Sequence, residues 1–336
     1  MNKIAKTVLM TGTALCAAGV VLSTAGYFAG GKDFTYTSDH MYVSGGNSSS
    51  RKNLTVMKKE QIDDFTKLNV DFENFDLDIR TSDDDHYYME YKLEKNGRKN
   101  PLTWKDKDGE LTLEESAGGS GSYYITYDLG IFSTHADLTE KKDALNTVIL
   151  YIPEKVQLSE AELQLSDGDL TADQLLCKEM TLELLNGDLM LDKGEFEKFD
   201  AKLSDGDLNV KGLQCTDNMQ LKSGNGDVTI KKAELADGQI ALSDGDLQID
   251  NGSFNGDMKI NSSCGDVSVE MKNGSVEKTN IYLKAADGDV DTEGLSRGKS
   301  DNEEDTSVYE NKAGASAPTL NVKCSDGDIT LTESEK

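Results

Sequence analysis

The residues best suited to chemistry in this sequence are aspartates that follow glycine at a nearly constant spacing. Consecutive members lie 19 or 20 residues apart: Asp169, Asp188, Asp207, Asp227, Asp246 and Asp266. If these aspartates stack above one another, calcium could bridge neighbouring carboxylates and turn carbonyls, because Ca²⁺ takes six to eight oxygen ligands in flexible geometry. A calcium ladder is therefore one hypothesis for these six residues.

The same pattern has a structural interpretation without metal. Aspartate accepts hydrogen bonds from turn amides, and glycine adopts positive φ angles at little cost. Carboxylates stacked about 4.8 Å apart repel one another by on the order of 1 kcal/mol per pair in water, which solvation and lysines can offset. A sparser second column would hold Asp167, Asp205 and Asp244, and the nonapeptide spacing of calcium-binding β-rolls is absent. We favour the hydrogen-bonding role, with no cofactor, and keep calcium as the alternative.

Groupings typical of catalysis are scarce in the sequence. The three histidines, His40, His86 and His135, lie outside the repeats, and neither GxSxG nor HExxH occurs. An aspartate at every turn is better explained by structure than by a single active site. We predict that the protein is not an enzyme and has no catalytic residue, although β-helices also carry carbohydrate-active enzymes, so that class stays an alternative.

The elements that position the aspartates are predicted to be short strands. Apolar residues alternate with polar ones on both sides of each Gly-Asp pair, which is the pattern of a strand with one buried face. Repetition near 20 residues indicates stacked rungs that bury their apolar faces against one another. One column after the turn begins with Leu170, Leu189 and Leu208, and a further column comprises Cys177, Phe196, Cys215, Leu235 and Phe254. We therefore predict an all-β, single-chain β-solenoid with about three short strands per rung.

Charge and cysteine content limit the classes of function. The 336 residues include 35 Lys and Arg against 62 Asp and Glu, a net charge of -27 that repels nucleic acid and anionic membrane surfaces. The five cysteines show no metal-ligand spacing. Cys177 and Cys215 should lie two rungs apart, too far for a disulfide, and serve as small buried hydrophobes. A bridge between Cys264 and Cys324 stays open as the less favoured alternative.

The first 31 residues are predicted to direct the chain to a membrane. Residues 7–31 carry no charge and follow Lys3 and Lys6. This run is longer than the apolar region of a cleavable signal and approaches the length of a membrane span. The positive-inside rule then places the remainder outside the cytoplasm. A retained anchor is favoured over a signal peptide cleaved near Ala25, which would give a secreted protein.

The remaining chain divides by composition. Residues 32–59 are expected to form a flexible tether, residues 60–153 an irregular N-terminal β cap region, and residues 154–336 the regular rungs. A hairpin is predicted around Asp108-Gly109. The segment 294–317 has few apolar positions and is expected to be a loop insertion before the final rung.

The strand 148–153 followed by Gly-Asp-aliphatic turns, together with the earlier segment 72–79, resembles the bacterial putative-adhesin family of β-solenoid domains over roughly residues 60–336. The resemblance implies an extracytoplasmic, membrane-tethered domain linked to surface attachment or envelope stress. It carries over no catalytic residues.

These observations favour a surface binding or scaffold module. The expected partners are a cell-surface or envelope protein or glycan, and the membrane through the N-terminal segment, with no nucleic acid. An accessory component of an envelope-stress sensing system is a further alternative. The sequence leaves the ligand and the oligomeric state open.

Overall fold

The computed structural model of the chain separates into two compact units. One unit comprises Thr55–Gly118 and Lys142–Lys336, and the other comprises Met1–Leu54 and Gly119–Lys141. The second unit contributes the antiparallel strands β1 (Phe34–Tyr36) and β2 (Met41–Val43). The residues that the structure describes are 34–36, 41–43, 54–117, 145–292, 295, 298–303 and 306–335.

The predicted membrane segment 1–31 and most of the predicted tether lie outside the described residues. No helix within the described ranges is long and apolar enough to cross a bilayer. These same ranges contain no α-helix and only one short 3-10 turn, Val276–Lys278.

Two strands make each regular rung. A long strand of 12 or 13 residues carries the buried positions before the Gly-Asp turn, and a strand of three or four residues follows the turn. The expectation of three short strands is corrected, because the predicted third column and the column before the turn lie on the same long strand, on which two consecutive outward residues separate them. The bounds are β10 (Leu158–Leu165), β11 (Leu170–Ala172), β12 (Leu175–Asn186), β13 (Leu189–Leu191), β14 (Gly194–Asp205), β15 (Leu208–Val210), β16 (Leu213–Asn225), β17 (Val228–Lys231), β18 (Ala233–Asp244), β19 (Leu247–Phe254), β20 (Met258–Cys264) and β21 (Val267–Met271).

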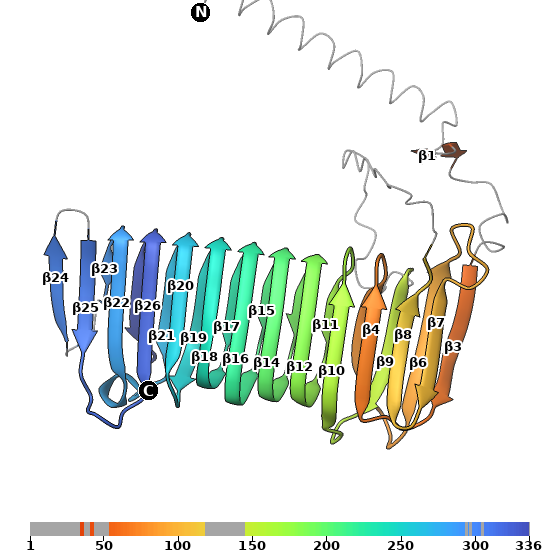
Figure 1. Cartoon of the computed structure of the whole chain (residues 1–336), viewed down its shortest axis with the longest axis horizontal. Coiled ribbons are helices and arrows are strands. Elements are labelled where there is room, and N and C mark those ends of the chain that lie inside the picture. Colours follow the sequence, from red (N-terminus) through yellow and green to blue (C-terminus); the bar gives the residue numbers. More distant parts are fainter. Residues whose placement is uncertain are drawn as a thin grey trace, which may run out of the picture. The chain divides into compact units, whose positions relative to one another are not determined.

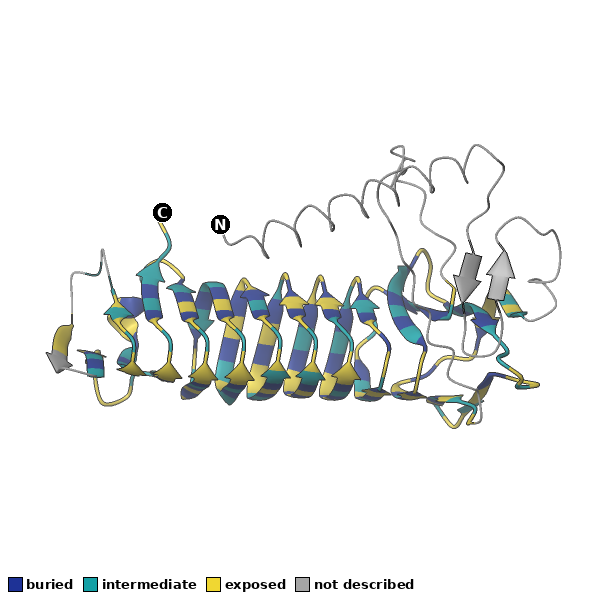
Figure 2. Cartoon of the chain, turned by 90° about the horizontal axis from the view of Figure 1, so that it is seen from above, coloured by how far each residue is buried: buried dark blue, intermediate teal, exposed yellow. Residues whose placement is uncertain are grey.

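Successive rungs pair in parallel and in register, which confirms the solenoid. Leu170 pairs with Leu189, Leu189 with Leu208, and Leu208 with Val228. The column that begins Cys177, Phe196 and Cys215 is likewise continuous. Residues of both columns are buried, and bands of buried and more exposed residues follow one another along the strands of the rungs (Figure 2). The core is therefore one apolar spine between two layers of strands (Figure 1).

We name the two layers after their regular strands. The long-strand layer runs β7-β8-β4-β10-β12-β14-β16-β18-β20-β26-β22-β25-β24, and the short-strand layer runs β3-β6-β9-β5-β11-β13-β15-β17-β19-β21-β27-β23. The N-terminal strands are β3 (Leu54–Ile62), β4 (Lys67–Phe72), β5 (Asp76–Ser82), β6 (Tyr87–Glu94), β7 (Leu102–Lys107), β8 (Glu110–Glu115) and β9 (Thr147–Pro153).

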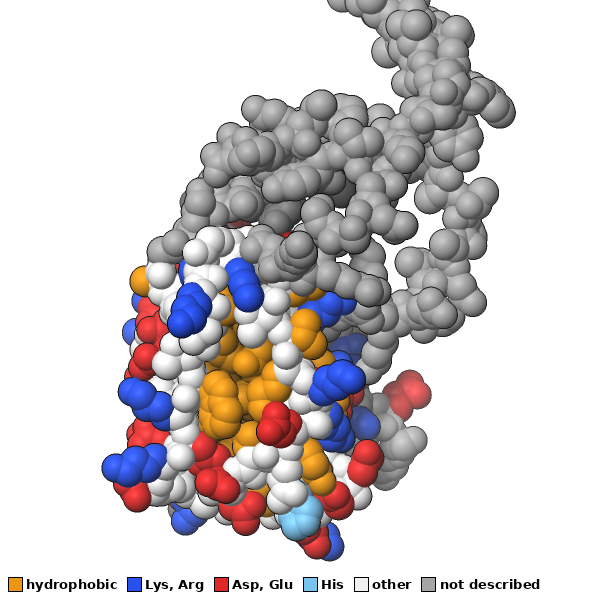
Figure 3. Space-filling view, turned by 90° about the vertical axis from the view of Figure 1, so that its right-hand side faces the viewer, with side chains coloured by type: hydrophobic (Ala, Val, Ile, Leu, Met, Phe, Trp, Pro, Cys, Tyr) orange, Lys and Arg blue, Asp and Glu red, His pale blue; other side chains and the backbone are white. Residues whose placement is uncertain are grey.

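The N-terminal end of the solenoid mixes parallel and antiparallel pairs. β7 and β8 form the predicted hairpin, with Asp108 and Gly109 at positive φ in its turn. β4 and β5 already stack in register under β10 and β11, so the first rung precedes the Gly-Asp repeats. Hydrophobic side chains gather in the middle of this end (Figure 3). On the edge strand β7, Trp104 keeps 38% of its surface exposed.

The C-terminal end departs from chain order. β26 (Thr319–Asp326) inserts between β20 and β22 (Asn280–Asp287), and β27 (Ile329–Glu333) lies between β21 and β23 (Val290–Asp291). The rung that comes last in sequence is thus internal in space. The expected loop 294–317 contains two strands, β24 (Lys299–Glu303) and β25 (Thr306–Asn311), which pair antiparallel and extend the long-strand layer beyond β22. The interpretation of this segment as a loop is corrected accordingly.

The four described cysteines are free thiols. Cys177, Cys215 and Cys324 are buried, whereas Cys264 is exposed. Cys177 and Cys215 face the core two rungs apart, with Phe196 between them. Cys264 pairs in register with Asp326 rather than with Cys324.

Candidate functional site

The predicted aspartates form one hydrogen-bonded ladder along an edge of the solenoid. The carboxylate Oδ1 of Asp169 accepts the backbone N–H of Asp188 at 2.9 Å, and Asp188 accepts that of Asp207 at 2.9 Å. Every later step repeats this contact at 2.8 or 2.9 Å. We call this set the aspartate ladder; in spatial order it is Asp76, Asp169, Asp188, Asp207, Asp227, Asp246, Asp266, Asp328 and Asp289.

Glycine precedes each repeated aspartate because the rungs approach too closely for a side chain. A methyl group on Gly206 would overlap the carbonyl oxygen of Gly187, and one on Gly226 would overlap that of Gly206. Gly206 and Gly226 also have positive φ, 136° and 130°. Gly187 shares the close approach without the positive φ. Backbone proximity therefore accounts for the whole glycine column, and conformational freedom for only part of it.

The second predicted column is a mixed one. Asp167, Asp205 and Asp244 alternate with Asn186 and Asn225, and each asparagine stands between two aspartates. The amide of Asn186 donates to Asp167 at 2.7 Å, and that of Asn225 donates to Asp205 at 2.6 Å. Because a neutral hydrogen-bond donor stands between the aspartates, like-charge repulsion between neighbouring rungs is reduced. The spacing of the aspartates alone does not predict these hydrogen bonds.

For the six predicted calcium ligands, the structure supports a defined role without metal. One carboxylate oxygen of each accepts a backbone amide of the next rung. Within the described ranges, no group of three or more His, Cys, Asp or Glu side chains is arranged to hold a metal ion. The ladder geometry therefore favours the hydrogen-bonding interpretation of these residues.

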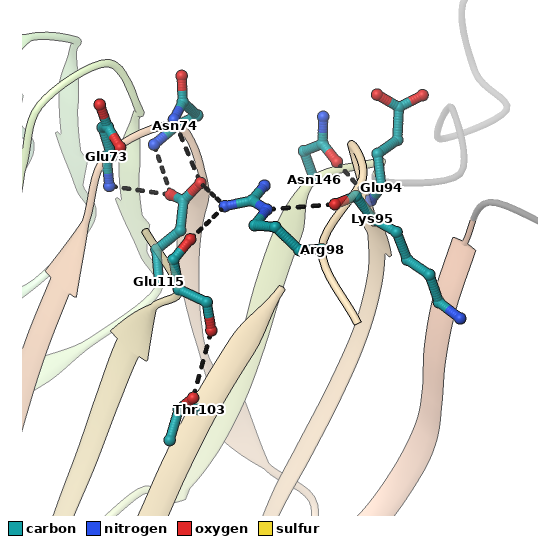
Figure 4. A network of polar contacts seen from close by, with 9 residues as sticks. Glu73, Asn74, Glu94, Lys95, Arg98, Thr103, Glu115 and Asn146 are labelled. Carbon is teal, nitrogen blue, oxygen red and sulfur yellow. Dashed lines mark hydrogen bonds and ion pairs between the residues drawn. The ribbon is translucent and has the colours of Figure 1, made fainter. Parts of the chain in front are cut away.

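A buried ion pair between Arg98 and Glu115 lies at the turn that follows β4, at the N-terminal end of the solenoid (Figure 4). The Glu115 carboxylate accepts the backbone amides of Glu73 and Asn74 at 2.9 and 2.6 Å, while Arg98 donates to Glu115 at 2.8 Å. The side chain of Arg98 is only 6% exposed, and that of Glu115 only 2%.

The position of this pair follows from the fold. In later rungs the corresponding turn amides donate to the preceding rung, as Asp167 does to the Glu73 carbonyl. At the first rung, the strand that neighbours β4 is β8, which ends at Glu115. Glu115 therefore takes over the accepting role, and Arg98 compensates its charge. Sequence reasoning missed both residues, which lie outside the repeats and 17 positions apart.

The first ladder member differs electrostatically from the others. Asp76 is half-buried, and it accepts the backbone N–H of Asp169 at 3.0 Å and the Thr147 hydroxyl at 3.3 Å. Burial raises the pKa of Asp76 above its ordinary value, and hydrogen bonding to the Asp169 amide opposes that rise.

The outer face of the long-strand layer carries a second ordered set of charges. Toward the N-terminal end, oppositely charged residues that pair in register form ion pairs between rungs. Lys67 contacts Glu160 at 2.7 Å, Lys198 contacts Glu179 at 2.8 Å, and Lys202 contacts Glu183. Exposed pairs of this kind contribute little to stability individually, about 0 to 1 kcal/mol each. They do leave these three lysines each paired with a glutamate of a neighbouring rung.

Toward the C-terminal end of the same face, three lysines lack such partners. Lys259 on β20, Lys323 on β26 and Lys284 on β22 point outward, and none forms an ion pair with a described residue. Lys284 and Lys323 are direct neighbours in register. Like charges placed opposite each other on neighbouring strands are destabilising. We call these three residues the lysine face.

A groove adjoins the lysine face. It has a volume of about 430 Å³ and is lined by residues of β22, β25 and the segment before β26, among them Tyr282, Glu310 and Lys312. Tyr282 is half-exposed and lies two residues before Lys284 on the same face of β22. The charge of Glu310 is partly compensated by Lys312, 3.6 Å away.

The groups considered for catalysis are not gathered at these surfaces. His86 lies in the loop between β5 and β6, where its backbone amide donates to Asp84, and His40 and His135 fall outside the described residues. Burial raises the pKa of Cys177 to about 12, so this thiol is protonated at neutral pH and a poor nucleophile.

Comparisons with known proteins identify one family. The sequence profile of the family described as Toastrack DUF4097 matches residues 65–332. A comparison with curated proteins finds no match.

Several solved structures are similar to the chain. A putative adhesin from Parabacteroides merdae is 16% identical, with 86% of this chain and 98% of that chain covered and a TM-score of 0.47. A putative lipid binding protein from Parabacteroides distasonis is 12% identical, with 86% and 98% covered and a TM-score of 0.45. A putative adhesin from Bacteroides fragilis is 14% identical, with 84% and 98% covered and a TM-score of 0.37.

Proposed function

Because the chain belongs to the Toastrack DUF4097 family, we propose that it is a membrane-anchored, extracytoplasmic β-solenoid that acts as a surface binding or scaffold module. The uncharged run 7–31 behind Lys3 and Lys6 supports the anchor and the orientation. A cell-surface or envelope protein or glycan is the proposed partner.

The observation that carries this proposal is the continuous register of the rungs. Residues 19 or 20 positions apart stand side by side over β10 to β19, and their outward side chains form regular rows. The aspartate ladder ties each turn to the next, so the edge is held by side chains as well as by the backbone. An extended surface with fixed spacing suits the recognition of a large or repetitive partner.

The exposed thiol of Cys264 gives a direct test of surface display. Intact cells that express the full chain are treated with a membrane-impermeant maleimide, and modified cysteines are identified by peptide mass spectrometry. The proposal predicts labelling of Cys264 without lysis, whereas buried Cys177, Cys215 and Cys324 react only after unfolding. A Cys264→Ser variant is the matched control. Labelling of Cys264 only after lysis would contradict the proposal.

The binding role needs a second measurement. Crosslinking in intact cells, followed by purification of the full chain, should recover an envelope protein or glycan at defined sites on the outward faces of the solenoid. Recovery with a membrane kinase or transporter would favour the alternative role in envelope-stress sensing. A displayed chain that crosslinks to nothing above the level of an unrelated anchored protein would refute the binding module.

A further inference from the structure

We infer that the lysine face and the adjoining groove bind a linear anionic polysaccharide. The inference rests on the proposed function and specifies the chemistry of its ligand. Three observations carry it: the unpaired charge of the lysine face, the arrangement of that charge across neighbouring strands, and the aromatic side chain at the border of the groove.

The charge pattern points to an anion. The protein has a net charge of -27, yet Lys259, Lys284 and Lys323 have no ion-pair partner among the described residues. By contrast, Lys67, Lys198 and Lys202, on the same layer, each form an ion pair with a glutamate. Lys284 and Lys323 repel each other as register neighbours, and a bound anion would reverse this unfavourable contact into an attractive one.

The arrangement favours an extended ligand. β20, β26 and β22 are adjacent strands (Figure 1), so their outward side chains recur about every 4.8 Å across the layer. Asn261 pairs in register with Lys323, and Asn321 with Lys259, which places amide donors beside the ammonium groups. A chain with an acidic group on successive units could contact several of these side chains together, whereas a compact anion could contact only one or two.

Tyr282 favours a sugar polymer over other polyanions. Its ring is half-exposed at the border of the groove, and its hydroxyl has no hydrogen bond to a described residue. An amphipathic tyrosine offers an apolar face to a sugar ring and a polar tip to its hydroxyls. An anionic membrane is disfavoured because the lysine face lacks the large apolar side chains that insert into a bilayer interface.

The test uses the purified full chain and polygalacturonate, a linear polymer of acidic sugars, with neutral dextran as the companion probe. Biolayer interferometry should show binding of polygalacturonate that weakens with salt, and no binding of dextran. The charge reversal K259E/K284E/K323E should lower the affinity roughly tenfold or more. Binding of this variant equal to that of the wild type would overturn the inference.

Two variants make the result specific. The control K178E/K198E/K202E changes net charge equally with exposed lysines of β12 and β14, and its affinity should stay within about twofold of the wild type. Tyr282→Ala should weaken polygalacturonate severalfold and leave inorganic polyphosphate binding unchanged. If Tyr282→Ala has no effect, or if polyphosphate or phosphatidylglycerol vesicles bind more tightly than polygalacturonate, the sugar-polymer assignment is wrong. Thermal melts of each variant confirm that it is folded.

Negative results in this experiment and in the display experiment would refute different claims. Absence of polygalacturonate binding combined with Cys264 labelling and capture of an envelope partner would refute only the ligand assignment. Binding in vitro without labelling on intact cells would refute the proposed surface role.

Discussion

A ladder aspartate combines a hydrogen-bond acceptor with a negative charge, and substitution can separate the two. Asp207→Ala removes the acceptor for the Asp227 amide and should destabilise the fold by about 1 kcal/mol. Asp207→Asn keeps an oxygen there and removes repulsion from neighbouring carboxylates, so its stability should equal or exceed that of the wild type. Urea unfolding measures both.

The same pair of variants distinguishes the metal hypothesis. Equal destabilisation by Asn and Ala, together with a melting temperature that rises with calcium and falls with EDTA, would show that the carboxylate charge is required. The hydrogen-bond account predicts a melting temperature unchanged by either addition.

Glycine at the turn is predicted to be irreplaceable for a local reason. Gly206→Ala places a methyl group against the Gly187 carbonyl and forces alanine into positive φ, so it should cost at least about 2 kcal/mol. Gly212 makes only an ordinary contact, with its nearest neighbour at 3.5 Å, and Gly212→Ala is the matched control. Comparable thermal melts for the two variants would contradict the close stacking of turns.

The half-buried Asp76 gives a pH dependence with a defined sign. Because the folded pKa is raised above the ordinary value of 3.8, the native state binds more protons in the window just above that value. Stability contributed by Asp76 is therefore lost as pH rises through the window. Asp76→Asn should gain stability relative to the wild type between pH 3 and pH 7, measured by urea unfolding at both. A constant difference between the two proteins would refute the shift.

For individual residues, the sequence predicted the positions of the repeated aspartates but not the contacts that they make. The spacing of Asp169 to Asp266 predicted the column, since an in-register stack needs only a constant period. The hydrogen bonds from Asn186 and Asn225 to neighbouring aspartates, and the accepting role of each ladder carboxylate toward the next rung, required coordinates. Periodicity shows which residues align but not which atoms they contact.

The Arg98–Glu115 pair connects the end of β8 to the turn after β4 at the N-terminal end of the solenoid. Removing Arg98 leaves Glu115 buried without its counter-charge, so Arg98→Ala should destabilise the protein by about 3 kcal/mol. Adding Glu115→Gln to that variant should recover part of the loss, because the neutral amide still offers an acceptor to Glu73 and Asn74. Urea unfolding of both variants, Glu115→Gln and the wild type completes a double-mutant cycle. Strict additivity would show that the pair is not coupled.

The order of elements was predictable only while chain order and spatial order agreed. The strands β10 to β21 follow the period, and the structure places them in sequence. The insertion of β26 between β20 and β22 leaves no local signal, because its residues fit the same column pattern wherever the rung is placed. The polar composition of β24 and β25 concealed two strands at this end of the layer, because the buried positions of β25 are Ser307, Tyr309 and Asn311, of which only Tyr309 is a large apolar residue.

For the solenoid unit as a whole, binding depends on how its surfaces are built. A net charge of -27 predicted repulsion of nucleic acid and anionic membranes, but this total averages over a face whose lysines are paired in one part and unpaired in another. The lysine face joins residues from positions 259, 284 and 323, whose proximity follows from the inserted rung. Overall composition could not have located it.

The most direct measurement of the register is a distance between two spin labels in one column. In a Cys16→Ser, Asp167→Cys chain, labels at position 167 and at exposed Cys264 lie five rungs apart, through Asn186, Asp205, Asn225 and Asp244. Pulsed electron–electron double resonance should give one narrow distribution of label-to-label distances centred at about 24 Å, which is five strand spacings. A broad distribution, or a mean beyond about 40 Å, would contradict the in-register stack and the binding surface built on it.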